Sequence, residues 1–179
     1  MYFDGSLKLE GAGAGVLFTS LAGEKLKYVL QILFPVSNNA AEYEDLVHGL
    51  RIAISLGIKR FMAYGDSLVV INQVNKDWDR SSDSMDKYCA AVRKLEDKFQ
   101  GIEYHHVGRN HNIDADILSK LGSARDKVSP GVFVQELLHP SIQLEELNVL
   151  LDRRILSLEG DEPMAPQFIQ FGVFSFSEK

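Results

Sequence analysis

Apolar side chains recur at every second position between residues 24 and 34, which is the period of a strand with one buried face. Residues 1–7 and 11–20 are also suited to strands, and Leu21-Ala22-Gly23 follows the second of them as a turn. The pattern therefore predicts three antiparallel strands at the start of the chain.

After Pro35 the apolar spacing becomes that of amphipathic helices. We expect Asn38 or Asn39 to cap a helix that runs to about Leu56, where Gly57 ends it. The later segments alternate between strands and helices. Strands are expected over residues 59–65 and 102–107, and helices over Ser67–Val74, Met85–Phe99 and Ile113–Leu121, the last closed by Gly122.

The resulting order, βββαβααβα, predicts an α/β fold in which helices cover a mixed sheet. Residues 1–125 are expected to form this domain. Residues 126–179 are interrupted by Pro130 and Pro140, carry one weak helical pattern and end in a phenylalanine-rich stretch. We interpret residues 126–179 as a linker and a C-terminal extension of uncertain order.

Composition is that of an ordinary globular protein, with 45% hydrophobic and 25% charged residues. No apolar run approaches the ~20 residues of a membrane helix, and the first residues lack the pattern of a secretory signal. The single cysteine, Cys89, excludes an intramolecular disulfide and suits a reducing compartment. We expect a protein of the cytoplasm or nucleus that is neither secreted nor embedded in a membrane.

The net charge of −6 argues at first against a nucleic-acid partner. Its distribution changes the picture, because residues 1–125 hold 15 basic and 16 acidic side chains and residues 126–179 hold 4 and 9. If several of the acids in the first part bind metal, the remainder of that part is mildly basic. Such a surface permits phosphate binding without demonstrating it.

Two acids lie on, or directly after, strands of the predicted sheet. Asp4 lies on the first strand, before Gly5, and Asp66 directly follows the strand over 59–65. Carboxyl ends of neighbouring parallel strands form a natural site, and two acids gathered there repel each other unless a cation lies between them. Taken singly, each acid has a simpler interpretation: Asp4 as a turn residue, or Asp66 as a helix cap.

The first helix singles out a third acid. With about 100° per residue and Leu46 at zero, Glu42 falls at about −40°, on the core-facing stripe, and Glu44 at about 160°, on the face expected to meet solvent. A carboxylate on the core face needs a partner, either a basic group or a shared metal. On the last helix the same arithmetic mildly prefers Asp114 and does not exclude Asp116.

Five motifs in this order then suggest a family: "YFDGS", "GAGAGVLF", "NNAAEYEDLVHGL", "YGDSLVVINQVN" and "NIDADILSKLGS". Together they resemble the ribonuclease H domain of gypsy-type LTR retrotransposon polyproteins, particularly those of plants, over about residues 1–125. The resemblance implies a ribonuclease H-like fold, a five-stranded mixed sheet with helices on both faces. It also implies hydrolysis of the RNA strand of RNA–DNA hybrids.

The resemblance further implies an active site of four carboxylates, Asp4, Glu42, Asp66 and Asp116, and here the motif favours Asp116 over Asp114. These acids would hold two Mg²⁺ or Mn²⁺ ions, hard cations that prefer carboxylate oxygens. If this is right, all four should converge on one ion-sized pocket. The implied partners are an RNA–DNA hybrid and the reverse transcriptase and integrase domains of a parent polyprotein, and the domain itself is expected to be a monomer.

Substrate contacts are expected from small polar groups and one cation. Ser6 and Ser67 lie beside the first and third acids, with a local turn or cap as the simpler role. Asn38 and Asn39 lie at a helix start, where backbone amides attract anions. Arg109 is the expected phosphate contact, and His111 is a candidate for proton transfer.

Several residues depart from the family's pattern. The first strand begins late, with three residues before Asp4, which favours fraying. Leu68 stands where the family usually has a polar residue, and Ile117 and Asp45 each replace a usual alanine. These departures motivate a second hypothesis, a catalytically weak or inactive nucleic-acid-binding relic of a retroelement.

Overall fold

The computed structural model describes residues 1–79 and 82–143, which belong to one compact unit. A six-stranded mixed sheet runs through it in the order β5-β4-β1-β2-β3-β6. The strands are β1 (Tyr2–Lys8), β2 (Gly11–Thr19), β3 (Lys25–Ile32), β4 (Arg60–Gly65), β5 (Gly101–His106) and β6 (Val132–Leu137). The helices are α1 (Asn38–Ser55), α2 (Leu68–Val74), α3 (Asp83–Glu96), η1 (Arg109–His111) and α4 (Ile113–Ala124).

The three-strand antiparallel start is confirmed. β1 pairs antiparallel with β2, and β2 with β3, from Ala12↔Ile32 to Thr19↔Lys25. On its other side β1 pairs in parallel with β4, with Phe3 opposite Gly65. β1 is therefore paired on both sides, and Asp4 follows the last pair that β1 makes with β4. This register brings Asp4 next to Asp66, the first residue after β4.

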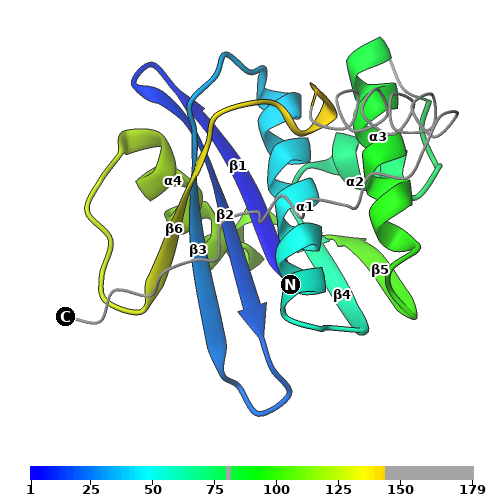
Figure 1. Ribbon diagram of the computed structural model, residues 1–179, viewed down its shortest axis with the longest axis horizontal. Helices are drawn as coiled ribbons and strands as arrows, with labels where there is room; N and C mark the ends of the chain where they lie inside the picture. Colours follow the sequence, from blue (N-terminus) through cyan, green and yellow to red (C-terminus); the bar gives the residue numbers. More distant parts are fainter. Residues whose placement is uncertain (80–81, 144–179) are drawn as a thin grey trace, which may run out of the picture. The chain divides into compact units, whose positions relative to one another are not determined.

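Helices cover the sheet on both faces: α1, α2 and α3 on one face and α4 on the other (Figure 1). The main core lies between the sheet and α1 to α3, and α4 packs mainly on β1, β2 and β3. The largest fully buried side chains of the main core include Tyr43, Phe3, Leu30, Leu46 and Leu50. A central helix α1 between the sheet and α3 is therefore buried along most of its surface.

The start of α1 differs from the prediction. Ser37 is the N-cap, because its hydroxyl accepts a hydrogen bond of 3.2 Å from the backbone N–H of Ala40. Asn38 and Asn39 are the first helical residues, not caps. The end agrees with the prediction, since Gly57 takes the left-handed conformation (φ 71°) just after the helix.

Helix α4 runs past its predicted end. Gly122 lies inside the helix, and Arg125, at φ 57°, ends it. A Cβ on Gly122 would lie 2.5 Å from the carbonyl oxygen of Leu30, so this glycine serves close packing on the sheet and not termination. Gly13 and Gly15 of β2 are the matching glycines on the sheet side.

A sixth strand extends the sheet beyond the five expected. β6 pairs in parallel with β3, from Lys27↔Val132 to Ile32↔Leu137. Part of the segment interpreted as a linker and extension, 126–179, therefore belongs to the sheet. Residues 144–179 lie outside the described residues. Within the described part of the chain, no helix is both long enough and apolar enough to cross a membrane.

Candidate metal centre

Three of the predicted acids meet in one place. Asp4 on β1, Glu42 near the start of α1 and Asp66 directly after β4 each offer a carboxylate oxygen, and these oxygens all lie within 4.8 Å of one another. Asp4 is 5% exposed and Glu42 6%. Acids separated by as many as 62 positions in the chain are therefore gathered where the parallel pairing of β1 and β4 ends.

Two hydrogen bonds and one ion pair hold these carboxylates. Glu42 Oε2 accepts from the backbone N–H of Gly5 at 3.0 Å, and Asp4 Oδ2 accepts from the hydroxyl of Ser119 at 2.5 Å. The exposed Arg109 reaches Asp66 Oδ2 at 3.4 Å. The amide of Asn112, at the start of α4, donates to the carbonyl of Phe3 at 2.9 Å and ties α4 to β1.

Burial and the charge of neighbouring acids raise the pKa of Asp4 and of Glu42. Burial raises the pKa of Asp4 from 3.8 to about 7, with further contributions from Asp66 and Asp116, while Ser119 opposes the shift. Burial, with the charge of Asp4, raises the pKa of Glu42 from 4.5 to about 8. Such a group is costly to ionise without a cation, and carboxylate oxygens are the donors that Mg²⁺ and Mn²⁺ prefer. The donor set therefore fits a divalent metal.

The fourth predicted acid lies beside this group without joining it. Asp116 raises the pKa of Asp4 by its charge, yet its Oδ2 is paired with Lys120 Nζ at 2.5 Å. The expectation that four carboxylates converge on one pocket is met by three. Asp114, the alternative that periodicity preferred, forms an ion pair of 2.8 Å with Lys25, and neither residue is buried.

The residues predicted to contact the substrate differ in their exposure and in their hydrogen-bond partners. The Ser6 hydroxyl lies 3.3 Å from that of Ser123 on α4, and Ser67 caps α2 by accepting from Val70 N–H. The Arg109 side chain is 93% exposed beside Asp66. His111, in η1, is exposed. Asn38 and Asn39 lie in the first turn of α1, where Asn39 is partly buried.

The prediction for Glu44 was wrong, because this residue is fully buried. Tyr88 of α3 donates to Oε1 at 2.6 Å, and Ser141 donates to Oε1 from its N–H at 2.8 Å and to Oε2 from its hydroxyl at 2.5 Å. His48 Nε2 lies 3.5 Å from Oε2. These donors hold the pKa of Glu44 below its ordinary value against the effect of burial. A buried polar cluster is thus formed by Glu44, His48, Tyr88 and Ser141.

Asp45 is a further buried acid that sequence reasoning noted only as a departure from the family. It is fully buried, and neither carboxyl oxygen has a hydrogen-bond partner. Burial, followed by the charges of Glu42 and Asp4, raises its pKa well above the ordinary value, and the backbone amides of Asp4 and Gly15 oppose this rise only in part.

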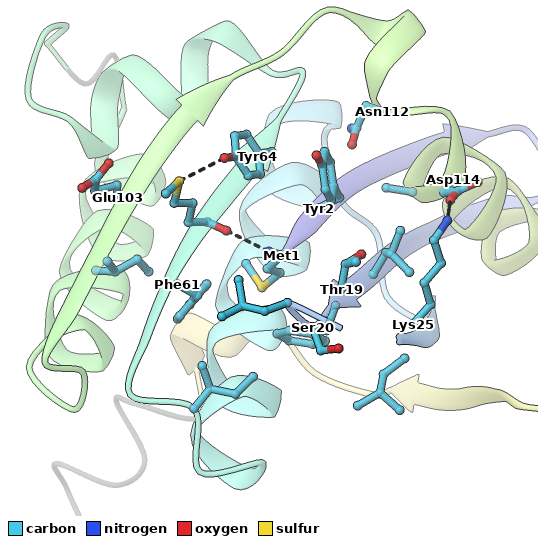
Figure 2. A pocket seen from close by; sticks show the side chains of 18 of the residues that line it. Met1, Tyr2, Thr19, Ser20, Lys25, Phe61, Tyr64, Glu103, Asn112 and Asp114 are labelled. Atoms are coloured by element: carbon cyan, nitrogen blue, oxygen red, sulfur yellow. Dashed lines mark hydrogen bonds and ion pairs between the residues drawn. The ribbon is translucent and has the colours of Figure 1, made fainter. Parts of the chain in front are cut away.

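A groove of about 1460 Å³ lies elsewhere on the domain. Figure 2 shows Phe61 of β4 on one wall, Thr19 and Ser20 on the other, and Met1 and Tyr2 between them. None of the four predicted acids lines it. The groove arises because β2 and β4 continue past the start of β1. Met1, just before β1, donates from its amino group to the carbonyl of Met62 at 2.7 Å. Met1 itself is only 7% exposed.

Known proteins share this sequence pattern and fold. The profile of the reverse transcriptase-like family matches residues 3–122. The uncharacterized protein YpeP of Bacillus subtilis is 32% identical over 127 residues, which make up 67% of this chain and 56% of YpeP. The chain therefore spans little more than half the length of this curated relative.

Two solved structures are similar to the domain. RNase H1 from Halobacterium salinarum is 27% identical, with a TM-score of 0.61 over 68% of this chain and 93% of that one. The N-terminal RNase H domain of a Mycobacterium tuberculosis protein is 26% identical, with a TM-score of 0.61 over 69% and 91% of the two chains. The mixed sheet, its helices and the acidic cluster define a ribonuclease H-like domain. The chain belongs to the reverse transcriptase-like family.

Proposed function

We propose that this protein is a metal-dependent ribonuclease H that hydrolyses the RNA strand of RNA–DNA hybrids. The observation that carries the proposal is the group formed by Asp4, Glu42 and Asp66, with carboxylate oxygens within 4.8 Å of one another. Similarity to ribonucleases H from Halobacterium salinarum and Mycobacterium tuberculosis supports the same substrate class.

Asp4, Glu42 and Asp66 would hold the first divalent cation, Mg²⁺ or Mn²⁺, and Asp116 would help to hold a second. Divalent cations supply charge neutralisation and an activated water for in-line displacement at phosphorus. For Asp116 to contribute, its carboxylate must exchange Lys120 for the cation, which is a small change because both side chains are partly exposed.

The remaining predicted residues would bind and orient the hybrid. Arg109 presents an exposed guanidinium beside Asp66, where it can contact a phosphate. Asn38 and Asn39 lie at the N-terminal end of α1, whose free N–H groups attract anions. Glu42 is placed to meet a ribose 2′-hydroxyl, the group that distinguishes RNA from DNA. We assign Ser6 and Ser67 to backbone contacts and His111 to proton transfer.

Hydrolysis of an end-labelled RNA–DNA hybrid in the presence of Mg²⁺ tests the proposal. Activity is expected in the wild-type protein and should vanish in Asp66→Asn. Asp116→Asn should lose most activity, whereas its neighbour Asp114→Asn, which breaks only an exposed pair with Lys25, should keep it. Equal activity in Asp66→Asn and the wild type would overturn the assignment.

The second candidate is a non-catalytic nucleic-acid-binding relic of a retroelement. It is favoured by the pairing of Asp116 with Lys120 and by the exposed Leu68 and Ile117 beside the site. Binding of Mg²⁺ and of the hybrid without cleavage, including with Mn²⁺, would support this candidate. We further propose an origin in a plant gypsy-type polyprotein with reverse transcriptase and integrase domains, acting in the cytoplasm or nucleus.

A further inference from the structure

Ser119 connects the first acid of the site to the helix that carries the fourth. It lies in α4, is fully buried, and places its hydroxyl oxygen 2.5 Å from Asp4 Oδ2. The same oxygen lies 2.9 Å from the carbonyl oxygen of Asp116, one turn earlier in the helix. A single hydroxyl group therefore contacts the carboxylate of Asp4 and the backbone of Asp116.

Close packing of α4 on β2 places Ser119 there. A Cβ on Gly15 would lie 2.5 Å from the backbone N of Ser119, and a Cβ on Gly13 would lie 2.5 Å from the carbonyl oxygen of Ser119. Gly15 is also the β2 partner of Asp4. Gly13 and Gly15, two of the three glycines in "GAGAG", thus let the backbone of α4 lie directly on the strand beside Asp4, within reach of a short hydroxyl side chain.

The hydroxyl has one proton and two acceptors to choose from. The bond to Asp116 C=O is the ordinary bond that a helical serine makes to its own backbone. A bond to an ionised carboxylate is about twice as strong as a neutral one, so the proton goes to Asp4 when Asp4 is charged. This bond fixes the torsion of the Asp4 side chain and occupies part of Oδ2. The rest of the carboxylate remains available to a cation shared with Glu42 and Asp66.

We propose that Ser119 is a positioning residue for Asp4, one that holds this carboxylate in the orientation required for divalent metal binding. The inference rests on the proposed metal site. The competing interpretation gives Ser119 only a packing role in α4. Groups that orient metal ligands typically change metal affinity or activity by ~10–100-fold when they are removed, whereas a packing role changes stability alone.

Ser123 provides a matched control on the same helix. It too is fully buried, its hydroxyl donates to Lys120 C=O at 3.1 Å, and its other neighbour is the hydroxyl of Ser6 and not a carboxylate. Ser119→Ala and Ser123→Ala therefore remove equal volumes and equivalent helix contacts. Ser119→Thr keeps the hydroxyl.

The experiment measures Mg²⁺ affinity by titration calorimetry, hybrid hydrolysis, and the thermal unfolding midpoint for all four proteins. Ser119→Ala is expected to weaken Mg²⁺ binding and lower kcat by ~10-fold or more, with the KM for the hybrid nearly unchanged. Ser119→Thr should restore most of both, and Ser123→Ala should match the wild type in metal affinity.

Equal Mg²⁺ affinity in Ser119→Ala and Ser123→Ala would overturn the inference and leave the proposed nuclease intact. A wild-type protein that binds Mg²⁺ in a Ser119-dependent manner but cleaves no hybrid would support the positioning role and contradict the proposed function. Absence of measurable Mg²⁺ and Mn²⁺ binding in the wild type would overturn both.

Discussion

The backbone N–H of Gly5 donates a hydrogen bond of 3.0 Å to Glu42 Oε2, and this bond ties the start of α1 to the strand that carries Asp4. A Cβ on Gly5 would lie 2.7 Å from the backbone N of Glu42 and 2.8 Å from the carbonyl carbon of Ala41. The glycine of "YFDGS" is thus the residue that allows the first two acids to approach each other.

Gly5→Ala should separate these acids. Its methyl group meets backbone atoms, which cannot move aside singly, so α1 must shift away from β1 at an expected loss of about 1–3 kcal/mol in the free energy of unfolding. Mg²⁺ affinity should fall with it. Urea unfolding and calorimetry measure the two effects. Gly101→Ala is the control, because the nearest atom to its Cβ is a side-chain carbon at 3.7 Å; equal behaviour of the two variants would contradict the prediction.

Asp45→Ala should stabilise the protein. The substitution removes a fully buried carboxyl group with no hydrogen-bond partner and places a better helix former in α1. We expect a gain of about 1–3 kcal/mol, the usual penalty of a buried polar group left unsatisfied. Urea unfolding at neutral pH checks this, and Asp45→Asn, which keeps the polar volume, should gain less. A loss of stability in Asp45→Ala would contradict this prediction.

Stability without metal should fall as pH rises. Asp4 and Glu42 have folded-state pKa values of about 7 and 8, above their ordinary 3.8 and 4.5. At a pH between the ordinary and the folded-state pKa of each acid, the folded chain holds a proton that the unfolded chain has lost. The free energy of unfolding therefore decreases with pH until both acids are ionised above about pH 8. Thermal unfolding in a chelator from pH 5 to pH 9 measures the effect.

Mg²⁺ should reverse this trend, because it binds the ionised carboxylates of the folded state. The rise in the unfolding midpoint on adding Mg²⁺ is therefore expected to be small at pH 5 and large at pH 8. Glu42→Gln should flatten both the pH dependence and the Mg²⁺ response. A midpoint in chelator that is independent of pH across this range would refute the assigned shifts.

Ser141→Ala should destabilise the protein without lowering activity per folded molecule. The variant removes the hydroxyl that donates to the buried Glu44 at 2.5 Å, at an expected cost of about 1–3 kcal/mol. Glu44 has a lowered pKa, so its contribution to stability is present above its ordinary pKa of 4.5 and is lost as pH falls below it. Acid unfolding should therefore begin at higher pH in Ser141→Ala than in the control Ser84→Ala, whose serine is exposed.

Local pattern was enough to predict much of the chain. Alternation predicted β3, short apolar stretches bounded by a turn predicted β1 and β2, and 3.6-residue periodicity placed Glu42 on the face of α1 that meets the sheet, where it joins Asp4 and Asp66. These predictions succeeded because each depends on which side of one element is buried, and that information is written in the spacing of neighbouring residues.

Periodicity failed where an element has more than one packed side. It assigned Glu44 to solvent, but α1 lies between the sheet on one side and α3 and Ser141 on the other. Its mild preference for Asp114 stays untested, although the structure pairs Asp114 with Lys25, 89 residues away, a contact that no local pattern reveals. The glycine stop signal failed for a similar reason: it ended α4 at Gly122, which instead packs against the carbonyl of Leu30.

The sequence by itself determined the order of the strands and helices as far as α4, and three carboxylates on or beside the right elements. Only the tertiary structure decided how these acids are held, by the backbone N–H of Gly5 on Glu42 and by the hydroxyl of Ser119 on Asp4. The physical reason is the distance along the chain between the residues that interact. Hydrophobic spacing reports the burial of each element separately, whereas hydrogen bonds and charge pairs at the site join residues that meet only when the sheet has formed.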